Sequence, residues 1–117
     1  MRNDIYQKLV EVARSNKLIS YEDLNMQLNL GLNFELSRDR DQIGQWLGEI
    51  SEYEVKAKRH MLSAVVGRKQ EDSVSDPGKG FYSWAQSLDV FQGGDDLAKI
   101  DFWVKEVKWL FDYWSKH

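Results

Sequence analysis

Four polar side chains near the middle of the sequence have the chemistry of DNA recognition. They lie within one stretch that has the apolar spacing of a helix: Arg38, Arg40, Gln42 and Gln45. Arginine and glutamine carry the hydrogen-bonding groups that match base edges in the major groove. Acidic residues such as Asp41 share the stretch and would repel phosphate. A solvated helix on a small domain is therefore the alternative interpretation.

A second group of basic residues follows in two halves. It consists of Lys56, Lys58, Arg59 and His60, then Arg68 and Lys69. An apolar strand is expected between the halves, and at ~3.3 Å per residue it would hold them roughly 26 Å apart. A solvated edge is thus favoured over one continuous patch.

The segment Asp76-Pro77-Gly78-Lys79-Gly80-Phe81 resembles a phosphate-binding loop only superficially. A P-loop needs the spacing G-x-x-x-x-G-K followed by Ser or Thr, and both the spacing and the hydroxyl are missing here. Backbone amides over residues 78–80, just before a helix, could still hold an anion. A plain turn is the alternative, because this composition is typical of turns.

Other residue types that commonly carry catalysis are sparse. The chain has no cysteine, which excludes disulfides, thiol nucleophiles and thiolate metal sites. His60 is the one internal histidine, and Ser63 lies in an apolar run with no base nearby in sequence. We expect no enzymatic activity, no metal and no small-molecule cofactor.

Aromatic residues near the C-terminus suggest an interaction surface. A helix over residues 95–116 is predicted by an inner stripe of apolar residues: Ile100, Trp103, Val104, Val107, Leu110, Phe111 and Trp114. Phe102, Trp109 and Tyr113 lie off that stripe, which makes them the candidate protein interface. The alternative is a helix buried on both sides within the monomer.

The elements that must position these groups follow from periodicity and capping. Helices are expected over residues 3–15, 21–30, 38–54, 81–88 and 95–116, with Ser20 and Ser37 as caps of the second and third. Residues 61–66 are apolar and β-branched and predict a buried strand. Residues 67–76 form a charged loop. Gly44 and Gly48, four residues apart, would permit close approach of a neighbouring element.

This order predicts a single α+β domain over residues 1–117. It is mostly helical and winged-helix-like, with a small β-sheet and a long C-terminal amphipathic helix. In such a domain residues 38–53 would be the recognition helix and residues 67–76 the wing.

Composition fits an ordinary soluble domain. Of the 117 residues, 42% are hydrophobic and 30% charged, and the net charge is −3. That balance argues against a stand-alone nucleic-acid binder, because phosphate contacts require basic residues. No apolar run approaches the roughly 20 residues that span a bilayer. We expect a cytoplasmic protein that does not bind membranes.

Three motifs resemble those of small, uncharacterised bacterial and phage-encoded domains with a winged-helix-like fold. They are Leu62-Ser63-Ala64-Val65-Val66, then Pro77-Gly78-Lys79-Gly80-Phe81, and finally Phe102-Trp103 with Tyr113-Trp114. The upstream I-S-Y-E-D-L is similar to a helix start in winged-helix domains, including those of alkyltransferase-like proteins. The alkyltransferase P-C-H-R motif is absent, so that activity is not implied. The resemblance covers about half of the chain and implies a prokaryotic or phage setting.

Together these features predict a non-enzymatic binding module that works through a protein–protein interface, with another protein or a second copy as partner. A phage or mobile-element accessory protein that modulates host machinery fits this profile. The alternative is a winged-helix DNA-binding regulator that contacts duplex DNA through the basic residues named above.

Overall fold

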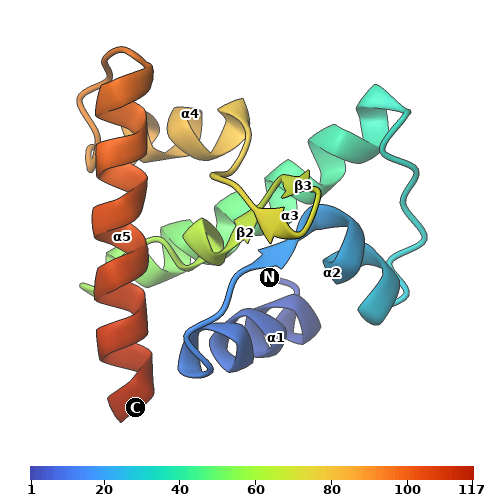
Figure 1. Ribbon diagram of the computed structural model, residues 1–117, viewed down its shortest axis with the longest axis horizontal. Helices are drawn as coiled ribbons and strands as arrows, with labels where there is room; N and C mark the ends of the chain where they lie inside the picture. The colour runs from blue at the N-terminus through green and yellow to red at the C-terminus, as the bar shows by residue number, and fades with distance from the viewer.

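The protein is a mostly helical α+β domain, as the sequence predicts. The structure is a computed structural model that describes residues 1–117. Its elements in chain order are α1 (Asn3–Arg14), β1 (Ile19–Ser20), α2 (Tyr21–Gln27), α3 (Ser37–Lys56), the 3-10 helix η1 (Leu62–Val65), β2 (Val66–Gly67), β3 (Lys69–Gln70), β4 (Ser73–Val74), α4 (Lys79–Ser87) and α5 (Asp96–Lys116). Figure 1 shows α5 running along one side of the molecule, with α4 crossing near its N-terminal end.

The predicted strand over residues 61–66 is wrong. Leu62–Val65 form a 3-10 helix, in which the Ala64 N–H donates to the Met61 carbonyl at 3.0 Å, and only Val66 and Gly67 are extended. A short apolar run signals burial without distinguishing a strand from a buried helical turn. Here η1 contacts α1, α3 and α5, so its side chains are covered in several directions and need no alternation.

Two small sheets flank this centre. In the first, β1 pairs in parallel with β2, with Ile19 opposite Val66. In the second, β3 and β4 form an antiparallel hairpin, with Lys69 opposite Val74. The charged loop expected over residues 67–76 therefore folds back on itself as a hairpin beside α2 and α3 (Figure 1).

Capping decides where several helices begin. The Ser20 hydroxyl accepts the Asp23 N–H at 3.0 Å, which confirms the predicted cap of α2. The expected Ser37 cap is wrong, because α3 begins at Ser37 itself and Leu36, the residue before it, offers no side-chain cap. The helix α2 ends at Gln27, earlier than predicted, and the following chain is held by two hydrogen bonds between the Asn25 side chain and the backbone of Leu32.

The long helix α5 buries part of the predicted stripe together with a charged residue. Glu106 is only 4% exposed and shares the inner face with Leu110 and Trp114. Ile100, expected inside, is 39% exposed. The Glu106 carboxylate on this face pairs with His60, which a count of apolar residues cannot anticipate. Trp103 also anchors α5, since its indole N–H donates to the Ala64 carbonyl at 2.9 Å.

None of the helices has both the length and the apolar character that crossing a membrane would require.

Candidate ligand-binding cleft

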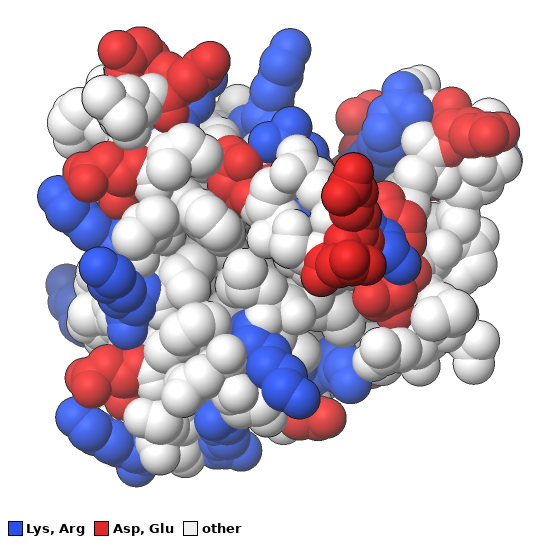
Figure 2. Space-filling view, in the orientation of Figure 1, with Lys and Arg blue, Asp and Glu red and all other residues white.

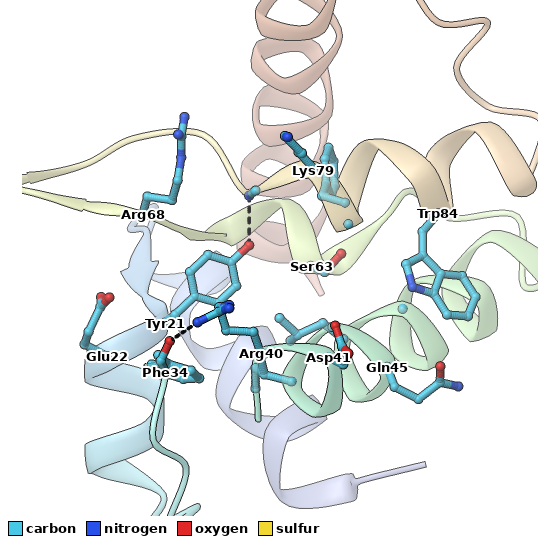
Figure 3. A pocket seen from close by; sticks show the side chains of 17 residues that line it. Tyr21, Glu22, Phe34, Arg40, Asp41, Gln45, Ser63, Arg68, Lys79 and Trp84 are labelled. Atoms are coloured by element: carbon cyan, nitrogen blue, oxygen red, sulfur yellow. Dashed lines mark hydrogen bonds between the residues drawn. The ribbon is translucent and has the colours of Figure 1, made fainter. Parts of the chain in front are cut away.

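A hollow lies between α3 and the start of α4. Its volume is about 830 Å³, against about 280 Å³ for a second hollow beside α1. Residues from α2, α3, η1, the hairpin and α4 line it, and Figure 3 shows their side chains around the opening. A hollow of this size is in the range of small-molecule sites.

Tyr21, at the start of α2, forms one end of the cleft. Its hydroxyl accepts the backbone N–H of Gly78 at 3.0 Å (Figure 3), which ties α2 to the turn before α4. Burial raises the pKa of the Tyr21 hydroxyl above its ordinary value, while the hydrogen bond from Gly78 acts in the opposite direction. The contact fixes the position of the α4 N-terminus relative to α2.

Asp76 orders the turn behind that contact. Its carboxylate accepts hydrogen bonds from the Arg68 guanidinium at 2.8 Å and from the Tyr82 hydroxyl at 2.8 Å. Burial is the main cause that raises the pKa of Tyr82, and the hydrogen bond to Asp76 raises it further. At Gly67 a Cβ atom would lie 1.8 Å from the Ser75 carbonyl oxygen, so the two arms of the turn lie in direct contact. Hairpin and α4 are thereby joined on one side of the cleft.

Trp84 of α4 forms the opposite end, where it lies directly over Gly48 of α3. A Cβ atom at Gly48 would come within 1.9 Å of the Trp84 ring. The predicted close approach at Gly48 is therefore confirmed. Gly44, one turn earlier, has nothing within 4 Å of the place that a Cβ would take, so no neighbouring element approaches it.

A pair of buried serine hydroxyls begins at the cleft wall with Ser63 and continues behind it with Ser51. Ser51 Oγ of α3 and Ser63 Oγ of η1 are 2.6 Å apart, and Ser51 Oγ also accepts the Ser63 backbone N–H at 3.2 Å. Ser63 lines the cleft and Ser51 does not. Figure 3 shows the Ser63 hydroxyl facing the space between α3 and α4.

The structure brings together three of the predicted DNA contacts and separates the others. Arg40, Gln45 and Arg68 line the cleft. The side chain of Arg38 is 82% exposed outside it, and Gln42 is half-buried on α3. The remaining basic residues are Lys56, Lys58, Arg59 and Lys69. The first three lie at or beyond the far end of α3, about 30 Å from its start at 1.5 Å per residue.

Most of these cations have partners within the protein. Carboxylates of the chain lie within ion-pair distance of five of them: Arg38, Lys56, Arg59, Arg68 and Lys69. Arg40 donates to the Phe34 carbonyl at 2.6 Å. Figure 2 shows basic and acidic side chains interspersed on the face it presents, with no continuous basic surface.

Arg59 has an evident structural role. Two of its guanidinium nitrogens donate to Glu54 Oε2, at 2.8 and 2.6 Å, and the Glu54 side chain is fully buried. Hydrogen bonding to Glu54 raises the pKa of Arg59 above its ordinary value. Its guanidinium therefore neutralises a buried carboxylate.

The predicted interface aromatics pack within the chain. The ring centroids of Phe102 and Phe91 are 4.9 Å apart. The Trp109 ring stacks between those of His60 and Tyr113, with centroid distances of 4.2 and 4.8 Å. Tyr113 stacks in turn on His117. These residues are half-buried, and the most exposed large apolar side chain of α5 is instead Leu97, at 77%.

Sequence reasoning missed Tyr21, Ser63 and Trp84 as parts of a site. Ser63 was expected as part of a strand, and no functional role was predicted for Tyr21 or Trp84. The one usable signal was the glycine-framed turn at residues 78–80, whose amides lie at the cleft through Gly78 and Gly80.

Comparisons with protein-family models, with curated proteins and with solved structures find no match, so the winged-helix-like family stays a prediction.

Proposed function

We propose that this chain is a non-enzymatic binding module acting through a protein–protein interface, and that a segment of the partner enters the cleft between α3 and α4. The proposal keeps the function expected from the sequence and moves the interface. The aromatic faces of Trp109 and Tyr113 are stacked within the chain, whereas the cleft offers a surface that no part of the chain covers.

The observation that carries the proposal is a pair of glycines facing the cleft. Gly44 of α3 and Gly80 of α4 both line it, and neither has any atom within 4 Å of the place that a Cβ would take. A glycine inside a helix such as α3 is about 1 kcal/mol less favourable than alanine. Because packing gives no reason for Gly44, close approach of an occupant to the helix backbone accounts for it.

The lining suits a peptide segment. Phe34, Phe81 and Trp84 supply aromatic surface, and charged groups of both signs surround it, as Figure 3 shows for Arg40 and Asp41. Buried aromatic contacts dominate the affinity of protein interfaces, and a polar rim excludes water from them.

Duplex DNA is the second proposal, favoured by Arg40, Gln45 and Arg68 around one cleft. Against it, the Arg68 guanidinium is paired with Asp76, and Asp41 lies on the same cleft wall as Arg40 and Gln45. Phosphate binding would have to displace that ion pair and approach a carboxylate.

Selection from a random peptide library displayed on phage tests the first proposal. Peptides enriched on the wild-type protein should bind Gly44→Ala more weakly, because its methyl group would take up space through which the occupant approaches the helix backbone. They should lose about tenfold or more in affinity on Gly44→Trp, whose indole would fill the cleft. Circular dichroism checks that both variants fold.

Two results would contradict this assignment. Peptides that bind Gly44→Trp and wild type alike, but fail on Tyr113→Ala, would return the interface to α5. Labelled duplex DNA that binds with a steep salt dependence, and is lost on Arg40→Glu, would favour the DNA proposal.

A further inference from the structure

Several hydrogen-bond donors that line the cleft have no acceptor in the protein. The Tyr21 hydroxyl accepts from Gly78 but donates to nothing. The backbone N–H groups of Lys79 and Gly80, in the first turn of α4, have no backbone acceptor, and no side chain caps that helix. These unused donors could bind a ligand that accepts hydrogen bonds.

The serine pair adds an independent, buried donor. Ser51 and Ser63 have two hydroxyl hydrogens but share one contact, so one O–H has no acceptor in the protein. Ser51 is fully buried and does not line the cleft, so the arrangement that leaves no hydrogen stranded there has Ser51 donating to Ser63. The Ser63 hydrogen is then free to point into the cleft, from a side chain only 5% exposed.

We infer that the partner segment is acidic and places an aspartate or glutamate carboxylate against Ser63, Tyr21 and the first turn of α4. A carboxylate accepts several hydrogen bonds and donates none, which matches a group of donors. The α4 N-terminus adds a favourable dipole, and the Lys79 ammonium at the rim has no carboxylate within ion-pair distance. This inference rests on the proposed function of the cleft.

Two acidic residues decide between a carboxylate and a more highly charged anion. Glu22 and Asp41 line the side of the cleft formed by α2 and α3, and neither has a basic partner within ion-pair distance (Figure 3). They would repel a dianionic phosphate or a nucleic-acid backbone more strongly than a single carboxylate. They can also accept backbone N–H groups of an extended segment lying between the two walls.

A titration followed by amide NMR tests the carboxylate with defined probes. The probes are the N-acetyl, N-methylamide derivatives of aspartate, of its near-isostere asparagine, and of phosphoserine. The aspartate probe should shift the Lys79 and Gly80 amides saturably at millimolar concentration, and the asparagine probe should not. Ser63→Ala should weaken the aspartate probe about tenfold, the effect of one hydrogen bond to a charged group.

Lys79→Met and Lys108→Met form a matched pair, because Lys108 is exposed on α5 away from the cleft. Only Lys79→Met should weaken the aspartate probe. Equal shifts with aspartate and asparagine, or no loss on Ser63→Ala, would overturn the inference. Tightest binding by phosphoserine would overturn it in favour of a phosphate ligand.

The same peptide library separates failure of this inference from failure of the proposed function. Cleft-dependent peptides without enrichment of Asp or Glu would refute the acidic partner and leave the binding cleft standing. No peptide sensitive to Gly44→Trp, together with a saturable aspartate site at Lys79 and Gly80, would refute the peptide-binding function and leave an anion site.

Discussion

At the scale of single residues, Gly44 and Gly48 have opposite reasons to be glycine. Gly48→Ala should lower the free energy of unfolding by about 1–3 kcal/mol, because its Cβ would press into the Trp84 ring, 1.9 Å away. Gly44→Ala should raise it by about 0.5–1 kcal/mol, because the same helix gains a better helix former with open space around it. Urea unfolding of both variants measures the difference.

Equal effects of the two alanines would show that Trp84 moves aside, and the cleft would then have a mobile end. The sequence predicts the close approach at Gly48, because two glycines one turn apart remove side chains from the same face. The sequence could not predict that Trp84 packs on Gly48 and leaves the space at Gly44 open. That depends on where α4 lies, which is set by contacts distant in sequence such as Tyr21 with Gly78.

At the scale of elements, His60 fixes how α5 lies on the domain. Its imidazole pairs with the Glu106 carboxylate and stacks on Trp109. His60→Phe keeps an aromatic ring but leaves Glu106 buried without that partner, so the free energy of unfolding should fall. Because His60 is half-exposed, water can reach the vacated side, and we expect about 1–3 kcal/mol. Faster hydrogen exchange along α5 would accompany the loss.

Glu106→Leu in the His60→Phe background is the control for that prediction. Removing the carboxylate removes the group left unpaired, so the double variant should be more stable than His60→Phe alone. A double variant as unstable as the sum of the single ones would mean that the pair does not hold α5. The predicted stripe included Leu110 and Trp114 but not Glu106, because a charged residue on the inner face breaks the apolar pattern. The length and position of the helix were nevertheless predictable from its apolar periodicity, and in the structure Asp95 caps its start by accepting the Ala98 N–H.

At the scale of the whole molecule, the helices were predictable from the sequence, but the cleft that they form together was not. Amphipathic periodicity is local, so five helices follow from it. The cleft joins α2, α3, η1 and α4, whose relative placement depends on long-range packing, and the error at residues 61–66 put a strand where η1 lies. Three residues that line the cleft, Arg40, Gln45 and Arg68, were predicted as DNA contacts. They lie there because α3 and the segment before the hairpin both border the cleft.

Stability of the whole domain should decline at alkaline pH through tyrosines behind the cleft. Burial raises the pKa of Tyr21 and of Tyr82, so the folded state favours the protonated hydroxyl. That stability is fully present below the unfolded-state pKa of about 10 and is lost as pH rises from there through the raised folded-state values. Each group should reduce the free energy of unfolding by about 1.4 kcal/mol per pH unit over that interval.

The variant Tyr82→Phe isolates one of these groups. It removes the ionisable hydroxyl and its hydrogen bond to Asp76, while Arg68 continues to pair with that carboxylate. Near neutral pH the variant should be less stable than wild type by about 1 kcal/mol, the contribution of one hydrogen bond. Above about pH 10 the two curves should converge, because only wild type must keep a buried tyrosine protonated. Urea unfolding at increasing pH measures both curves. Parallel curves would show that Tyr82 ionises as an exposed tyrosine does, and that the turn before α4 opens before the domain unfolds.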